Sequence, residues 1–112
     1  MSIHASDPGT DIGPLQGSAS VLGLGGVTTV VVSGEFDVAT SAGLGEALGL
    51  ACATGTDVVL DMTGVTFLDG SGLRWIEHAA TLLLSEGRSM RIANPPRVVV
   101  RLLQAAGAMD ML

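Results

Sequence analysis

One hydroxyl group in the sequence stands in a position suited to phosphoryl chemistry. Ser71 lies between Gly70 and Gly72, where an apolar strand pattern gives way to a helix pattern. Small neighbours leave room for another protein to approach the oxygen, and a helix N-terminus offers N–H groups and partial positive charge that stabilise a phosphate. Ser71 is therefore a candidate phosphorylation site. The alternative is that Ser71 is only the N-cap of the helix, a position that serine often occupies.

The residues that would make the chain an enzyme are absent or badly placed. No lysine is available to hold phosphates, and the glycine cluster at 23–26 precedes a strand pattern instead of opening a helix, as a dinucleotide-binding loop would. His78 lies seven residues beyond Ser71 on the same predicted helix, and we expect it on another face, out of reach as a base. No His or Cys has metal-ligand spacing. We therefore expect no catalytic residue, no metal and no cofactor.

Three carboxylates fall where α/β proteins place functional groups. Asp37, Asp61 and Asp69 lie just past predicted strands or before predicted helices. Magnesium held by the three, as in a phospho-acceptor receiver domain, is the weaker alternative because the usual lysine is missing. For Asp61 we expect capping of nearby backbone N–H groups. The role of Asp69 stays open on this evidence.

Composition narrows the class of protein. A length of 112 residues suits one domain, and no apolar run reaches the roughly 18 residues that a membrane helix needs. With no secretion signal and a single cysteine, Cys52, we expect a cytoplasmic protein. The formal charge of −6 opposes binding to nucleic acid and direct membrane insertion, so a partner with a basic surface fits better.

Residues 1–17 lack apolar periodicity and are interpreted as a flexible N-terminal arm, with the domain spanning 18–112. Strand patterns at 19–24 and 27–33 flank a glycine pair typical of a hairpin turn. A third strand is predicted at 57–62, covered on both faces or nearly so, and a fourth at 89–93. Strands alternating with helices indicate an α/β fold with packed helices, a mixed, mostly parallel sheet and an N-terminal antiparallel hairpin.

Three helices are predicted between and after these strands. The first is capped by Thr40 and ends near Gly55, and its three glycines suggest close packing. The second runs from Ser71 to about Glu86, and the third follows the proline pair at 95–96 and reaches Gln104. Helical spacing gives the first two helices these apolar faces: Leu44, Ala47, Leu48 and Ala51 on the first, and Leu73, Ile76, Ala80, Leu83 and Leu84 on the second.

Trp75 and Leu82 fall outside the apolar face of the second helix. An exposed Trp beyond a phosphorylatable serine would suit partner recognition, because Trp is enriched among binding hot spots. The alternative is that Trp75 lies over a neighbouring helix.

The stretch from Val58 to Leu73, VVLDMTGVTFLDGSGL, resembles the signature of the STAS family, which is named for sulfate transporters and anti-sigma factor antagonists. Two further segments are similar to family motifs in the same order: 32–40 (VSGEFDVAT) and 90–95 (MRIANP). The resemblance covers about residues 18–112 and implies a single STAS-like domain. Many well-studied members have a second serine where this chain has Gly70.

In stand-alone bacterial members of that family, the serine that matches Ser71 is phosphorylated by a partner anti-sigma factor that is also a serine kinase. The resemblance therefore implies an anti-sigma factor antagonist that regulates transcription by partner switching, with at most a weak homodimer. The expected partner-binding residues are Asp37, Thr40, Asp69, Gly70, Gly72, Trp75, Leu82 and Asn94. Two alternatives remain: a STAS subunit of a transport or lipid-trafficking complex, and a module that binds a nucleotide or small ligand.

Overall fold

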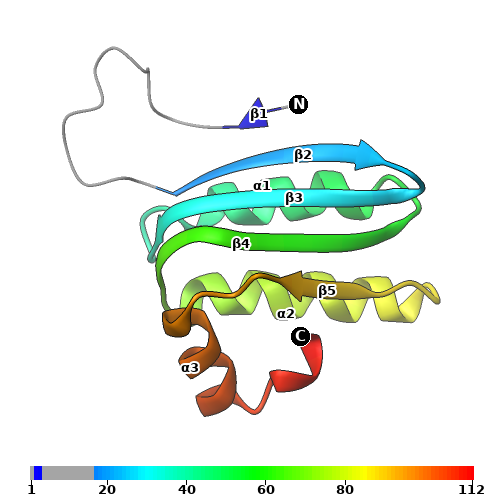
Figure 1. Cartoon of the computed structure of the whole chain (residues 1–112). Helices are drawn as coiled ribbons and strands as arrows, with labels where there is room; N and C mark the ends of the chain where they lie inside the picture. The colour runs from blue at the N-terminus through cyan, green and yellow to red at the C-terminus, as the bar shows by residue number, and fades with distance from the viewer. Residues whose placement is uncertain (1, 4–16) are drawn as a thin grey trace.

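The computed structural model describes residues 2–3 and 17–112, which form a single α/β domain (Figure 1). The elements are β1 (Ser2–Ile3), β2 (Ser18–Leu24), β3 (Val27–Phe36), α1 (Ser41–Cys52), β4 (Asp57–Leu68), α2 (Gly70–Ser85), β5 (Met90–Ala93), α3 (Arg97–Ala106) and the 3₁₀ turn η1 (Met109–Met111). The sheet order is β1-β2-β3-β4-β5, with antiparallel pairing as far as β3 and parallel pairing from β3 to β5. The predicted fold class is confirmed.

The start of the domain is fixed by a tight contact. Gly17 precedes β2, and a Cβ atom at this position would come within 2.4 Å of the Phe36 ring, so only glycine fits without a shift. Most of the predicted arm lies outside the described residues. From that part of the chain, Ser2–Ile3 forms β1, which pairs antiparallel with β2.

The predicted hairpin is confirmed. Gly25 and Gly26 both have positive φ, 58° and 81°, as the turn between β2 and β3 requires. The β3 strand extends three residues beyond the predicted 27–33, to Phe36. This extension carries the chain to the edge of the sheet from which α1 begins.

β4 is longer than the sequence indicates. The predicted strand at 57–62 continues to Leu68, and its additional residues at 64–68 also pair with β3. The pairing register shifts twice, between Val31 and Ser33 and between Gly34 and Glu35. Such irregularities interrupt the two-residue alternation of side chains, which concealed the second half of the strand in the sequence.

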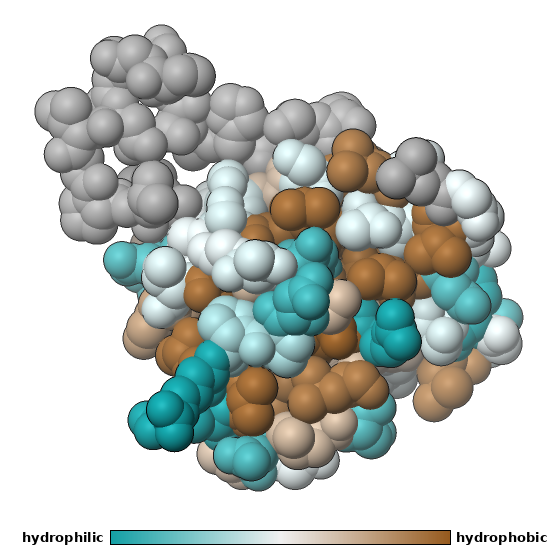
Figure 2. Space-filling model, viewed as in Figure 1, coloured by the Kyte–Doolittle hydropathy of each residue, from teal (hydrophilic) through white to brown (hydrophobic). Residues whose placement is uncertain are grey.

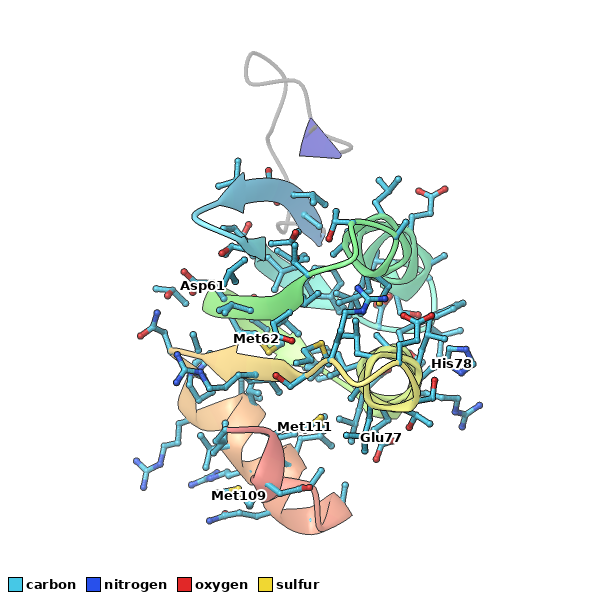
Figure 3. The ribbon with its side chains drawn as sticks, turned by 90° about the vertical axis from the view of Figure 1, so that its right-hand side faces the viewer. Asp61, Met62, Glu77, His78, Met109 and Met111 are labelled. Atoms are coloured by element: carbon cyan, nitrogen blue, oxygen red, sulfur yellow. The ribbon has the colours of Figure 1, made fainter. Side chains whose placement is uncertain are left out.

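Helices cover one face of the sheet, not both, so the prediction of a strand covered on both sides is wrong. Val58, Leu60 and Met62 are buried, whereas the intervening residues of β4 are exposed or partly buried. Figure 3 shows Asp61 and Met62 on opposite sides of the sheet, with α1 and α2 on the side of Met62. On the other face, apolar and polar side chains are interspersed (Figure 2).

The helix layer follows the predicted faces with one correction. All four predicted α1 residues are buried, and so are Leu73, Ile76 and Leu83 of α2. Leu84 is 73% exposed, contrary to the prediction, and Ala79 is buried instead. The buried face of α2 is rotated toward Ala79 because this helix packs against α1 as well as against the sheet.

The third helix begins and ends as expected. α3 starts at Arg97, directly after the proline pair, and stops at Gly107, which has a φ of 69°. It lies beyond the β5 edge of the sheet (Figure 1), where Val99 and Leu103 are fully buried. No helix in the described part of the chain has the length and apolar character needed to cross a bilayer.

Candidate functional site

The candidate site forms where β3 and β4 end side by side. Phe36 and Leu68 are the last paired residues of the two parallel strands, and the Asp69 N–H donates to the Phe36 carbonyl (3.2 Å). The chain then leaves β3 toward α1 and leaves β4 toward α2. Parallel pairing thus places two helix-starting segments, 37–40 and 69–72, at the same edge of the sheet.

The N-cap of α2 is Asp69, so the interpretation of Ser71 as a plain N-cap is wrong. The Asp69 carboxylate accepts from the backbone N–H groups of Ser71 (2.9 Å) and Gly72 (3.3 Å). The Leu73 N–H donates to the Asp69 carbonyl (3.0 Å). Ser71 stands inside the first turn and is not the residue that caps the helix.

The Ser71 hydroxyl donates to the same Asp69 oxygen, with an Oγ–Oδ1 distance of 2.5 Å. This hydrogen bond is the main reason why the pKa of Asp69 lies below its ordinary value. Burial raises the pKa, but the backbone N–H donors lower it further, so the net shift is downward. Asp69 is therefore ionised at neutral pH, and the hydroxyl is both partly exposed and oriented. Ser71 thus combines access with a fixed direction.

The amides at the start of α2 are already occupied. Two of the N–H groups that a free helix terminus would offer to an anion, those of Ser71 and Gly72, bond to the Asp69 carboxylate. The start of α2 is therefore not an empty anion site, because the Asp69 carboxylate already bonds to these two N–H groups. The same finding weakens the nucleotide-binding alternative.

Asp37 closes the neighbouring turn by the same means. Its carboxylate accepts from the N–H groups of Ala39 (2.9 Å) and Thr40 (3.1 Å) and from the Thr40 hydroxyl (3.1 Å). Thr40 occupies the N-cap position of α1 but makes no side-chain cap, contrary to the prediction, because its oxygen accepts from the Asp37 N–H (3.0 Å) and its single proton is shared between Asp37 and the Glu35 carbonyl. Asp37 and Thr40 thus form a hydrogen-bonded turn at the same edge of the sheet as the segment 69–72.

The two glycines around Ser71 have different environments. A Cβ on Gly70 would meet no heavy atom within 4 Å, so the approach to Ser71 from this side is open. Gly72 is buried, and a Cβ there would come within 2.4 Å of Leu68 Cδ1. Gly72 therefore allows α2 to pack closely on the sheet, while Gly70 leaves space for another molecule to approach Ser71.

An exposed stripe runs along α2 from Ser71. Ser71, Trp75, His78 and Leu82 are spaced at i, i+4, i+7 and i+11 and share one side of the helix. The expectation that His78 faces elsewhere is wrong. His78 nevertheless lies two turns from Ser71, roughly 10 Å along the axis, and is too far to act as its base. We call these four residues the α2 stripe.

Trp75 lies over α1 and remains 42% exposed. A Cβ on Gly45 would come within 2.7 Å of the indole ring, so the ring rests directly on the backbone of α1. The expectation of close packing at the α1 glycines holds for Gly45, whereas Gly43 and Gly49 face open space. Beside the ring, a pocket of about 230 Å³ is lined by Gly45, Leu48, Gly49, Cys52, Trp75, His78, Ala79 and Leu82.

Asn94 and Asp61 form a separate pair. Asp61 accepts from the Thr63 N–H (3.0 Å), the Thr63 hydroxyl (2.6 Å) and Asn94 Nδ2 (3.5 Å), which agrees with its predicted capping role. Asn94 has a φ of 53°. Asp61 precedes the end of β4 by seven residues, or roughly 20 Å of strand, so the structure does not bring Asn94 to Ser71.

Gly45 is the site residue that the sequence interpretation did not single out. The sequence shows that α1 contains glycines beside its buried face. It does not show which of them contacts Trp75, because that depends on how α1 and α2 pack together. In the described residues, no group of three or more His, Cys, Asp or Glu side chains is arranged to hold a metal ion.

Comparison with known proteins gives one family and a consistent fold. A family model described as the STAS domain matches residues 18–112. An anti-sigma factor antagonist from Mycobacterium paratuberculosis is 24% identical, with a TM-score of 0.73 over 85% of this chain and 81% of that chain. No curated protein sequence matched the chain.

Two further solved structures are similar in fold. The anti-sigma factor antagonist SpoIIAA in its unphosphorylated form is 16% identical, with a TM-score of 0.72 over 83% of this chain and 84% of that chain. SpoIIAA of Bacillus in the phosphorylated form is 14% identical, with a TM-score of 0.64 over 83% of this chain and 86% of that chain.

Proposed function

The chain belongs to the STAS domain family, and on that premise we propose that it is an anti-sigma factor antagonist controlled by phosphorylation of Ser71. Unphosphorylated, it binds an anti-sigma factor that is also a serine kinase and so frees the sigma factor. After phosphorylation of Ser71 it releases that partner. The proposed place of action is the cytoplasm.

The observation that carries the proposal is the position of the Ser71 hydroxyl. It is partly exposed, is held by Asp69 at 2.5 Å and stands at the head of the α2 stripe, next to the open space at Gly70. A kinase can reach such a hydroxyl while it contacts the rest of the stripe. Modification and partner contact would then share one surface, as partner switching requires.

The electrostatics of the first turn favour release. A phosphate adds a charge of about −1.5 to −2 at neutral pH. On Ser71 it would lie beside the ionised Asp69, and that carboxylate already occupies the nearby N–H groups. The added charge is therefore poorly compensated within this chain, and burying it in an interface carries a large desolvation cost.

Recovery of the partner tests the proposal directly. The chain is used to capture proteins from the source cytoplasm with and without added ATP, and the bound fraction and the chain are both examined by mass spectrometry. We expect an anti-sigma factor that leaves as phosphate accumulates on Ser71. Phosphate found only at Ser41, Thr63 or Thr66, or on no residue, would reject Ser71 as the switch.

Trp75 is expected to be a binding hot spot. Trp75→Ala should weaken binding of the anti-sigma factor by more than about 1 kcal/mol, or more than roughly fivefold, because large exposed aromatic side chains dominate many interfaces. Its thermal unfolding temperature should change little because the ring is 42% exposed. Calorimetric titration and thermal denaturation of the same samples measure both effects.

Substitutions on α1 provide the control for Trp75. Gly45→Ala should also weaken binding, because its Cβ would displace the indole ring. Gly43→Ala adds the same methyl group in open space on the same helix, at a residue that does not line the pocket, and should bind normally. If unfolding temperature falls sharply in Trp75→Ala while the folded molecules bind normally, Trp75 belongs to the core and not to the interface.

The chain alone is expected to transfer no phosphate. It has no lysine, and His78 is two turns from Ser71. Purified protein incubated with labelled ATP or GTP and magnesium should therefore neither hydrolyse nucleotide nor label itself over several hours. Turnover that survives repeated purification and disappears in Ser71→Ala would place the protein among enzymes.

A further inference from the structure

We infer that Asp69 accepts the proton of the Ser71 hydroxyl when Ser71 is phosphorylated, so that the chain supplies part of the catalytic machinery for its own modification. This inference rests on the proposed function, because it requires a kinase that transfers phosphate to Ser71. It assigns Asp69 to the reacting atoms, in addition to its position at a partner surface.

The geometry places a proton acceptor on the reacting oxygen. Ser71 Oγ lies 2.5 Å from Asp69 Oδ1, within the range of a strong hydrogen bond from a hydroxyl to a carboxylate. Among the described residues, Asp69 is the only hydrogen-bond partner of that hydroxyl. Because the hydrogen is directed at Asp69, the lone pairs of Oγ are directed away from the carboxylate.

The acceptor is held rigidly by the backbone. The same Asp69 oxygen receives N–H groups from Ser71 at 2.9 Å and Gly72 at 3.3 Å, and the Asp69 N–H is bonded to the end of β3. The carboxylate, the hydroxyl and the helix terminus therefore form one unit. Preorganisation of this kind lowers the cost of reaching the reactive geometry.

The step balances without any group outside the proposed reaction. A lone pair of Ser71 Oγ forms a bond to the γ-phosphorus of ATP held by the partner kinase, and the bond from that phosphorus to the oxygen bridging to the β-phosphate breaks. ADP leaves with the electron pair of that bond. The hydroxyl proton passes to Asp69 Oδ1 and then to water.

The capping role and the proton-accepting role can be separated by one substitution. Asn is as good an N-cap as Asp, so Asp69→Asn keeps an oxygen for the N–H groups of the first turn but removes the basic carboxylate. Asp69→Ala removes both functions. If Asp69 is only a cap, Asp69→Asn should be phosphorylated at the wild-type rate and only Asp69→Ala should be impaired.

The experiment compares full-length wild type, Asp69→Asn, Asp69→Ala and Asp61→Asn with the captured anti-sigma factor kinase and ATP. Asp61→Asn is the matched control, since it removes the same charge from a carboxylate that caps Thr63 in another part of the sheet. Single-turnover phosphorylation is followed by mass spectrometry at saturating kinase, binding is measured without ATP, and folding is checked by thermal denaturation.

We expect Asp69→Asn to fold and bind the kinase but to be phosphorylated about 10- to 100-fold more slowly than wild type. This loss is smaller than the roughly 10²–10⁴-fold usual for a general base, because phosphoryl transfer passes through a loose transition state. Asp61→Asn should react at the wild-type rate. An unchanged rate in Asp69→Asn would overturn the inference and assign the proton to a group of the kinase. A wild-type chain that the kinase does not label at all would instead overturn the proposed function.

Discussion

Ser71→Glu is expected to weaken binding of the anti-sigma factor by at least about 100-fold, whereas Ser71→Ala should bind nearly as well as wild type. The glutamate carboxylate would lie next to Asp69, whose oxygen already takes the first N–H groups of α2. Leaving one more charge uncompensated in an interface typically costs about 3–5 kcal/mol. Ser71→Ala removes only a hydroxyl, at a cost of about 1 kcal/mol in folding stability, since Asp69 keeps its backbone donors.

Binding of purified partner by calorimetric titration measures this difference. Ser89→Glu is a suitable control, because Ser89 is exposed and lies before β5, where its carbonyl accepts from Val58 at the start of β4, far from α2's first turn. It adds the same charge and should bind normally. Equal losses in both glutamate variants would mean that added negative charge anywhere weakens the complex, and binding by Ser71→Glu at the wild-type level would remove Ser71 from the interface.

Gly72→Ala is expected to lower the free energy of unfolding by about 1–3 kcal/mol, the usual cost of overpacking a core. An alanine within a helix is ordinarily more favourable than glycine by roughly 0.5–1 kcal/mol, so the expected sign is the reverse of the general rule. The reason is local: the new Cβ would come within 2.4 Å of Leu68 Cδ1, where α2 packs on the end of β4.

Gly70→Ala is the matched control in the same turn. No heavy atom lies within 4 Å of a Cβ at Gly70, so this variant should be as stable as wild type or slightly more stable. Urea denaturation of the two variants gives the free energies to compare. Similar stabilities for Gly70→Ala and Gly72→Ala would show that α2 can move away from Leu68 at little cost.

The elements with strong periodicity were predictable from sequence, and the second half of β4 was not. The hairpin, α1 and α3 carry either alternating residues with a glycine turn or an apolar helical face with a clear stop. In β4, the buried residues Met62, Val65 and Leu68 are three apart because the register shifts. A strand with one exposed face and an interrupted alternation resembles a polar loop.

The candidate site was predictable as a location but not as a mechanism. The motif around Ser71 identified the start of a helix, yet both Asp69 and Ser71 are good N-caps, and composition cannot choose between two residues so close together. The choice is made by the hydrogen bond from the Asp69 N–H to the Phe36 carbonyl, which ends the strand and fixes where the helix begins. Likewise, the contact between Trp75 and Gly45 depends on the packing of two helices.

That contact links the identities of two residues 30 positions apart. The indole ring of Trp75 occupies the volume that any side chain at position 45 would need, since a Cβ there would lie 2.7 Å from the ring. A large side chain can therefore be present at position 45 of α1 or at position 75 of α2, but not at both. Among relatives of this chain, a larger residue at position 45 should therefore occur together with a smaller residue at position 75. Such a domain would present a flatter α2 surface to a different set of partners.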